Sequence, residues 1–162
     1  FPPEMRLQLK AGVLATSAGD AKLARARELG AAGAANYRTG DWAREIVALA
    51  GGQGPDVVID SVGGETFAPA LDILKPGGRL ATYRATAGVV KDLAPRAVFW
   101  KQITVLGTTM GSPREFEAML RLYDAGGLRP VVDRVFPLAE ASEAHRRMEE
   151  GGQFGKIVLS VG

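Results

Sequence analysis

Polar residues and glycines follow a short apolar run near the middle of the chain. The run, at positions 57–59, consists of β-branched residues and predicts a strand buried on both faces of a parallel sheet. Open α/β sheets bind ligands beyond the carboxyl ends of their strands. Asp60, Ser61, Gly63 and Gly64 are therefore the first candidate binding residues. Because glycine tolerates positive φ, the two glycines are also explained by a turn that meets no ligand.

Composition excludes several other kinds of site. The 162 residues are 46% hydrophobic and 23% charged, which predicts one ordinary domain with a sizeable core. The net charge of +2 comes from basic residues spread along the chain, so no nucleic-acid partner is expected. There is no cysteine and only one histidine, His145, so neither a disulfide nor a metal site is predicted. We assign His145 a structural or surface role rather than that of a general base.

Hydropathy along the chain predicts a protein without a membrane segment. No charged stretch is followed by an apolar leader, and no apolar run approaches the roughly 18 residues that a membrane helix needs. A cytoplasmic location is the resulting expectation.

Strand and helix patterns alternate along the chain. Strands are expected at residues 13–16, 34–37, 57–59, 79–83, 103–106, 131–136 and 156–161. Helices are expected at residues 20–29, from 39 or 41 to 50, 65–74, 112–126 and 138–150. Residues 5–9 fit either a strand or the end of a helix. This alternation predicts a parallel three-layer α/β sheet.

Caps and apolar stripes define the expected helices further. Asp20 is the predicted N-cap of its helix. Ser112 and Glu115 form the pattern of a capping box around a proline at the first helical position. Helical spacing predicts that the following side chains face the core: Trp42, Ile46, Leu49, Phe116, Met119, Leu120, Tyr123, Leu138, Ala141, Ala144 and Met148.

Several motifs together resemble the medium-chain dehydrogenase/reductase superfamily. The closest branch is similar to NADPH-dependent quinone oxidoreductases and relatives called zinc-binding dehydrogenases. The resemblance covers residues 10–162 and implies a Rossmann-like fold. It rests on A-K-L-A-R-A-R-E-L-G-A (21–31), N-Y (36–37), D-V-V-I-D-S-V-G-G (56–64), L-K-P-G-G-R-L (74–80), F-W-K-Q (99–102) and A-H-R-R-M-E-E-G-G-Q-F-G-K-I-V-L (144–159).

The resemblance also shows what is missing. Relatives have a first strand that leads into a glycine-rich turn, whose backbone N–H groups bind the pyrophosphate. The chain has neither, and the Gly51-Gly52-Gln53-Gly54 cluster follows a helix, so we interpret it as a connection. Residues 1–130 are then a truncated dinucleotide-binding domain beginning at the end of the first helix. Residues 131–162 are a strand-helix-strand unit that in relatives returns to the catalytic domain, which is also absent.

A phosphate-binding edge is implied by three positions. Lys22, Tyr37 and Arg38 match the residues that receive the 2′-phosphate of NADP(H), where cations form charge-assisted hydrogen bonds. Thr16 and Ser17 stand where NAD-specific relatives have an acidic residue. NADPH is therefore expected in preference to NADH. The alternative is that the two cations are solvated surface residues.

The remaining implied ligands come from two other stretches. Asp60, Ser61, Val62 and Gly63 match the loop beside the nicotinamide ribose. Phe154, Gly155 and Lys156 match the closing strand that approaches the cofactor from the other side. No residue of the chain matches a catalytic one.

Arg84 departs from the pattern, because relatives have glycine at this position. A long cation there would obstruct the nicotinamide ring or contact a phosphate. Obstruction is favoured, since glycine is used where a backbone passes close to a ligand.

We also expect weak cofactor binding, because the glycine-rich turn is missing. Two or three lost charge-assisted bonds, at ~1.5 to 3 kcal/mol each, cost about 3 to 9 kcal/mol.

Three functions follow as hypotheses. The chain is part of an NADP(H)-dependent quinone or enone reductase, or a non-catalytic dimerising or binding module derived from one. A methyltransferase is a third hypothesis, because L-K-P-G-G-R-L also occurs in that class, but its glycine-rich motif is absent.

The strand between Ile103 and Thr108 resembles the one that joins family dimers, so a homodimer is expected. Apolar surface is expected on the segment from Val131 to Val161.

Overall fold

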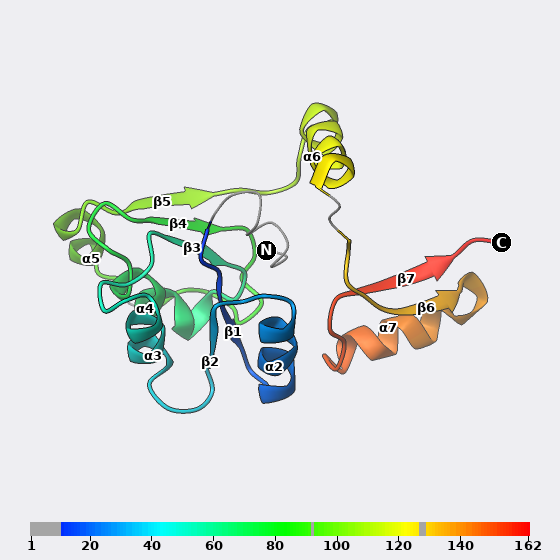
Figure 1. The fold of residues 1–162 in the computed structure, drawn as a ribbon, viewed down its shortest axis with the longest axis horizontal. Helices are drawn as coiled ribbons and strands as arrows, with labels where there is room; N and C mark the ends of the chain where they lie inside the picture. The colour runs from blue at the N-terminus through cyan, green and yellow to red at the C-terminus, as the bar shows by residue number, and fades with distance from the viewer. Residues whose placement is uncertain (1–10, 92, 127–128) are drawn as a thin grey trace.

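A computed structural model describes residues 11–91, 93–126 and 129–162 (Figure 1). The strands are β1 (Leu14–Ser17), β2 (Gly33–Asn36), β3 (Val57–Asp60), β4 (Arg79–Thr82), β5 (Thr104–Gly107), β6 (Val132–Pro137) and β7 (Lys156–Ser160). The helices are α2 (Asp20–Glu28), α3 (Trp42–Leu49), α4 (Phe67–Asp72), α5 (Pro95–Trp100), α6 (Pro113–Gly126) and α7 (Ala141–Glu149), with 3₁₀ turns η1 (Gly64–Thr66) and η2 (Leu138–Glu140). The predicted segment at residues 5–9 lies outside the described residues.

The described strands pair in parallel, which confirms the α/β class. They form three sheets rather than one, with the orders β1-β2, β3-β4-β5 and β6-β7. A sheet continues only where neighbouring strands exchange hydrogen bonds. Within the described residues, β1 pairs only with β2 and β3 pairs only with β4, so the sheet is interrupted between β1 and β3.

Small residues allow helices to cover both faces of β2. Gly33, Ala34 and Ala35 are all buried, and both α2 and α3 pack against this strand. A Cβ atom at Gly33 would lie 2.9 Å from the methyl groups of Leu49 in α3. The absence of larger side chains on β2 therefore lets α3 approach closely, which produces helix–sheet–helix layering at this point.

One hydrophobic cluster connects the first two sheets. Ala35, Ile46 and Ile73 are buried together, and Leu14 of β1 and Val58 of β3 pack against them. The two sheets therefore share one layer of helices although β1 and β3 do not pair. A second cluster lies under β4 and α4 and consists of Phe67, Ala70, Leu71, Leu74, Leu80 and Ile103.

The prediction that β3 is buried on both faces was wrong. Val57 and Ile59 are 50% and 46% exposed, whereas Val58 packs into both clusters. A continuous apolar run leads to burial on both faces only when neighbours cover both faces. On β3 the described residues cover the face that carries Val58 and leave the opposite face, with Val57 and Ile59, open to solvent.

The start of α6 was predicted correctly, but its burial was not. Ser112 Oγ accepts from the Glu115 backbone N–H at 3.3 Å, and the Glu115 carboxylate accepts from the Ser112 N–H at 2.7 Å, which is a capping box. The predicted core residues Phe116, Met119 and Leu120 are exposed, Phe116 by 57%. Figure 1 shows α6 projecting away from the sheets. Helical spacing identifies an apolar face without identifying a neighbour for it.

The C-terminal elements form a unit of their own beside the other sheets (Figure 1). Helix α7 packs on β6 and β7 and buries Phe136 and Ala144. Leu138 and Met148, also predicted to face the core, are about half exposed. Asp133 of β6 accepts hydrogen bonds from Arg147 Nε and, at 2.9 Å, from Arg147 Nη2. The ion pair between Asp133 and Arg147 thus joins α7 to β6 and adds to the limited apolar contact that the helix makes with the strands.

Candidate cofactor-binding edge

The carboxyl ends of β1 and β2 bring four predicted residues together. Thr16 and Ser17 lie opposite Ala35 and Asn36 in the parallel register. The N–H of Tyr37 donates to the Ser17 carbonyl at 3.1 Å. The Asn36 side chain then accepts from the N–H of Arg38 at 3.0 Å, which turns the chain back over the strand end. Thr16, Ser17, Tyr37 and Arg38 therefore share one edge of the sheet.

Asp20 lies at the same edge, and its predicted role as a cap was wrong. Gly19 is the N-cap of α2, and Asp20 is the first helical residue and makes no cap bond. Its carboxylate accepts from Asn36 Nδ2 at 2.8 Å instead. The carboxylate thus binds the Asn36 side chain instead of the backbone N–H groups of the helix start. The edge thus carries a fixed negative charge that was not included in the predicted site.

Lys22 projects from α2 toward the C-terminal unit. Its Nζ donates to the carbonyl oxygen of Gly151, just beyond α7, at 2.6 Å. By contrast, the guanidinium of Arg38 forms no hydrogen bond or ion pair with any described residue, and its side chain is exposed. Of the two predicted phosphate-binding cations, Arg38 is available and Lys22 is already engaged.

The carboxylate of Asp60 serves its own loop. Asp60 is only 6% exposed, and its oxygens accept from the backbone N–H of Val62 and of Gly63, both at 3.1 Å. These bonds fold residues 60–63 into a tight turn directly after β3. Because the carboxylate oxygens face the backbone of the loop, Asp60 supports the turn, and the parts of this stretch left for a ligand are Ser61 and the backbone.

The loops that follow β3 and β4 are hydrogen-bonded to each other. The N–H of Ala87 donates to the Val62 carbonyl at 2.8 Å, and that of Gly64 to the Gly88 carbonyl at 3.1 Å. Gly63 and Gly64 have φ of 65° and 53°. A Cβ at Gly64 would lie 2.7 Å from the Ala87 carbonyl oxygen. The turn and the neighbouring loop thus account for both glycines without a ligand.

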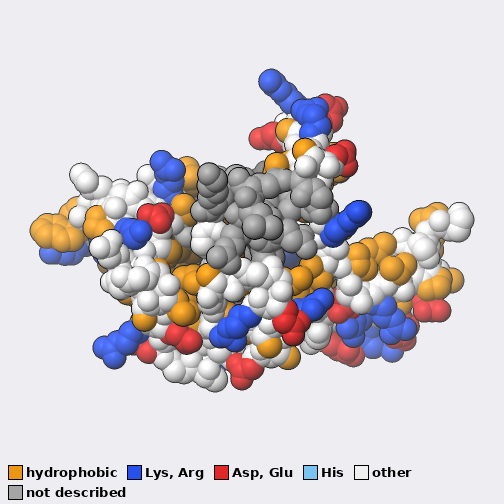
Figure 2. Space-filling view, viewed as in Figure 1, with side chains coloured by type: hydrophobic (Ala, Val, Ile, Leu, Met, Phe, Trp, Pro, Cys, Tyr) orange, Lys and Arg blue, Asp and Glu red, His pale blue; other side chains and the backbone are white. Residues whose placement is uncertain are grey.

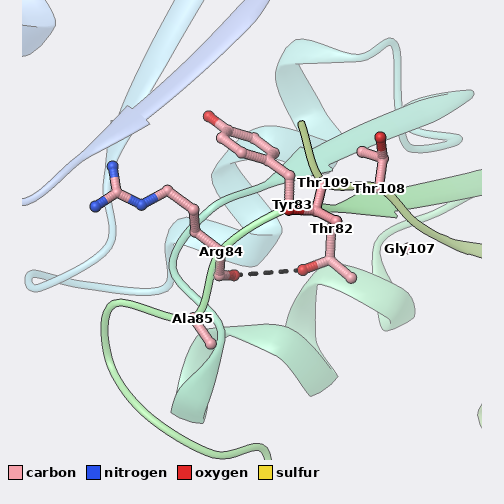
Figure 3. Close-up of a pocket in the computed structure, with 7 residues that line it drawn as sticks. All are labelled: Thr82, Tyr83, Arg84, Ala85, Gly107, Thr108 and Thr109. Carbon is pink, nitrogen blue, oxygen red and sulfur yellow. Dashed lines mark hydrogen bonds between the residues drawn. The ribbon is translucent and has the colours of Figure 1, made fainter. Parts of the chain in front are cut away.

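A shallow, open cavity of about 520 Å³ lies on the surface at the carboxyl ends of β4 and β5. Its lining consists of Thr82, Tyr83, Arg84, Ala85, Gly107, Thr108 and Thr109 (Figure 3). Sequence reasoning singled out only Arg84 among them. The hydroxyl-bearing residues after β5, Thr108 and Thr109, were missed, although their place directly after a predicted parallel strand was a usable signal.

The third predicted stretch, Phe154 to Lys156, lies at the start of β7 in the C-terminal unit. The N–H of Phe154 donates to Asp133 at 3.0 Å, and that of Lys156 to the Val131 carbonyl at 2.8 Å. Gly155 has φ of 105°, and a Cβ there would lie 2.4 Å from the same carbonyl. Hydrogen bonds from Arg147 and Phe154 lower the pKa of Asp133 to about 2. Asp133, which is ionised at neutral pH, therefore fixes this stretch against β6.

Neither a metal centre nor a membrane span is found in the described part of the chain. No three His, Cys, Asp or Glu side chains there are grouped so that they could hold a metal ion. The His, Asp and Glu side chains of the described residues therefore do not fit a zinc ion. None of the described helices is long and apolar enough to cross a membrane.

Parallel strands with candidate ligands at their carboxyl ends place the chain in the class of open α/β folds, which bind ligands at this edge of the sheet. The family model "Zinc-binding dehydrogenase" matches residues 29–159, and the chain belongs to this family. Its fold is similar to the crystal structure of an NAD-dependent alcohol dehydrogenase, with a TM-score of 0.89 and 39% identity, over 99% of this chain and 47% of that one.

Curated relatives match over most of the chain. It is 37% identical to a 2-haloacrylate reductase from Burkholderia sp, over 93% of this chain and 48% of the relative. It is 28% identical to quinone oxidoreductase-like protein 2 from Bos taurus, over 94% of this chain and 46% of the relative. The chain thus spans about half the length of the curated relatives it matches.

Proposed function

We propose that the chain is the nucleotide-binding and C-terminal portion of an NADP(H)-dependent reductase that transfers hydride to a quinone or an activated C=C bond. The supporting observation is the edge of β1 and β2, where the Tyr37 N–H donates to the Ser17 carbonyl and Arg38, which follows, forms no side-chain bond with any described residue. The name of the 2-haloacrylate reductase describes reduction of an activated alkene, which is in keeping with this class of substrate.

Each candidate residue has a distinct part in binding. Arg38 and Lys22 hold the 2′-phosphate by charge-assisted hydrogen bonds, and Tyr37 lies along the adenosine side. The bound nucleotide would supply the hydride. Ser61 and the backbone of residues 61–63 border the nicotinamide ribose, and residues 154–156 approach from the C-terminal unit. We assign no described residue the role of acid, base or nucleophile in the reaction.

Affinity for the nucleotide is expected to be low. The described residues include no glycine-rich turn, and the two or three charge-assisted bonds that such a turn makes are worth about 3 to 9 kcal/mol. Since each 1.4 kcal/mol is about tenfold in affinity, a micromolar site would weaken to millimolar or beyond. The fixed carboxylate of Asp20 beside the phosphate-binding edge lowers it further by charge repulsion.

A second candidate function is a non-catalytic module that dimerises or binds another protein. It is favoured by the exposed apolar side chains on β5 and α6, including Val105, Leu106 and Phe116. We propose a homodimer in which β5, whose outer edge is unpaired within the described chain, joins its counterpart in a second copy. We further propose that the chain is cytoplasmic and that its two domains meet between residues 130 and 131.

The experiment is a titration of the purified chain with NADPH and with NADH, following nicotinamide fluorescence and thermal shift together. Saturable binding of NADPH, with weaker binding of NADH, supports the reductase proposal. Binding is expected to weaken in Arg38→Gln and to persist in Arg44→Gln, a matched exposed arginine at the start of α3. Equal binding of NADPH and NADH, or NADPH binding that is unchanged in Arg38→Gln, contradicts the proposal and favours the binding module.

A further inference from the structure

Arg84 is an exposed cation that lines the shallow cavity. Its guanidinium forms no hydrogen bond or ion pair with any described residue. Among the seven residues that line the cavity it alone carries a charge, and the others bring hydroxyl groups or small apolar side chains. An anion placed here would meet one positive charge and no carboxylate from the lining.

The backbone below this side chain is held in place. Thr82 Oγ1 donates to the Arg84 carbonyl at 3.4 Å, and the Tyr83 N–H donates to the Asp60 carbonyl at 3.2 Å. The Thr108 N–H donates to the Thr82 carbonyl at 3.0 Å, which fixes β4 to the end of β5. Arg84 thus extends from a fixed base rather than from a free loop.

Figure 3 shows how the polar tips are arranged around this base. The guanidinium of Arg84 and the hydroxyl of Tyr83 point to the same side of the strand end, away from Thr108 and Thr109. The Tyr83 ring lies between the guanidinium and the threonines. The Tyr83 ring does not cover the guanidinium of Arg84, so the guanidinium and the Tyr83 hydroxyl are both open to a ligand.

We propose that Arg84 binds the carboxylate of a small unsaturated organic acid, with Tyr83 as a second donor. A planar guanidinium offers two parallel N–H groups that match the two oxygens of a carboxylate. The ring of Tyr83 gives the unsaturated part of the acid a flat apolar contact. The role of this acid as a substrate rests on the proposed reductase function, whereas its binding does not.

Charge balance favours a carboxylate over a phosphate at this position. A carboxylate carries one negative charge, which the guanidinium of Arg84 neutralises. A phosphomonoester carries about 1.5 to 2 negative charges at pH 7, which would require a second cation. None is present among the lining residues. Arg84 then provides an anion site rather than an obstruction.

The test is NMR titration of the purified chain with sodium acrylate, with acrylamide as the uncharged analogue and inorganic phosphate as the competing anion. Acrylate is expected to bind in the millimolar range and acrylamide at least about tenfold more weakly, since it lacks the charge. In Arg84→Gln the affinity for acrylate should fall about tenfold. The affinity of Arg84→Lys should lie between those of the unchanged chain and Arg84→Gln, because lysine keeps the charge but lacks the two parallel N–H groups of the guanidinium.

The matched control is Arg79→Gln. Arg79 is exposed at the opposite end of the same strand, β4, and its replacement should leave acrylate binding unchanged. Arg38→Gln should also leave it unchanged, which separates this site from the nucleotide edge. Equal affinity for acrylate in the chain and in Arg84→Gln overturns the proposal. So does inorganic phosphate binding more tightly than acrylate through Arg84, which would assign the arginine to a nucleotide phosphate.

Discussion

Lys22 Nζ donates a 2.6 Å hydrogen bond to the carbonyl oxygen of Gly151, across 129 positions of the chain. The bond connects α2, which borders the candidate phosphate site, to the end of α7 in the C-terminal unit. A carbonyl at a helix C-terminus is a good partner for an ammonium group, because the helix dipole is negative there. A 2′-phosphate at this edge must therefore draw Lys22 from an existing partner or share it.

Lys22→Gln tests the contribution of this residue to the preference for NADPH. Loss of one charge-assisted bond should weaken NADPH about tenfold and leave NADH nearly unchanged, since only NADPH carries the 2′-phosphate. The measurement is the same fluorescence titration used for the unchanged chain. Arg25→Gln, one turn further along α2 and paired with Glu28 at 2.7 Å, is the control. An equal loss for both nucleotides would show that Lys22 does not read the phosphate.

Asp133→Asn should loosen the C-terminal unit in a pH-dependent way. The pKa of Asp133 is lowered to about 2 in the folded chain, from an ordinary value of 3.8. A lowered pKa means that the carboxylate stabilises the fold at pH above the ordinary value, and that this stabilisation is lost as the pH falls toward about 2. The variant should therefore exchange its β7 amide hydrogens faster at pH 7, with a difference that shrinks toward pH 3.

The partner variant Arg147→Met serves as the second arm of this comparison. It removes the same ion pair, and it leaves the bond from the Phe154 N–H to Asp133 in place. Exchange at Phe154 should then rise less than in Asp133→Asn. If the two variants are indistinguishable at every pH, the ion pair alone fixes the unit, and the Phe154 bond contributes nothing measurable.

Gly54→Ala should destabilise the chain more than Gly52→Ala. The two glycines have φ of 83° and 84°, so the backbone strain of an alanine is the same at both. A Cβ at Gly54 would lie 1.9 Å from the Ile73 carbonyl oxygen, whereas one at Gly52 meets nothing within 4 Å. Gly52→Ala should cost about 1 kcal/mol and Gly54→Ala several times as much in urea unfolding. Similar midpoints would mean that the contact is relieved by a small shift.

Val105→Pro should convert the proposed homodimer to monomers. The amides of Thr104 and Thr108 donate to β4, so in a parallel ladder the Val105 N–H points to the free edge of β5. Proline removes that donor and keeps the bonds to β4. Light scattering at high concentration gives the mass. Val89→Ser, at an exposed position outside the strands, should leave the dimer intact, and a monomeric mass for the unchanged chain would contradict the proposal.

The order of strands and helices could be predicted because each pattern is local. The capping box at Ser112 and the glycine stop after α3 depend on residues within one turn, and both appear in the structure. Helix α5 was missed: it has only six residues and little periodicity, and only Pro95 at its start signals it.

Burial and partners could not be predicted as well, because they depend on what lies across space. The runs at Val57 and Phe116 are apolar enough for a core, but the described chain places nothing on part of their surface. Likewise, Lys22 and Asp20 were assigned from their neighbours in sequence, whereas their partners, Gly151 and Asn36, are brought to them by the fold. That the predicted cofactor residues bind a nucleotide stays a prediction.

The bonds between the loops after β3 and β4 have a practical consequence for spectroscopy. Thr86 is exposed, and its N–H and hydroxyl both contact the Ser61 carbonyl, at 3.5 and 3.2 Å. The chain has no cysteine, so Thr86→Cys would give one thiol for one dye. The variant loses the hydroxyl contact, but the bonds from Ala87 to Val62 and from Gly64 to Gly88 still join the two loops. The single label would therefore report events at either strand end, and its emission would follow acrylate and nucleotide in the same cuvette.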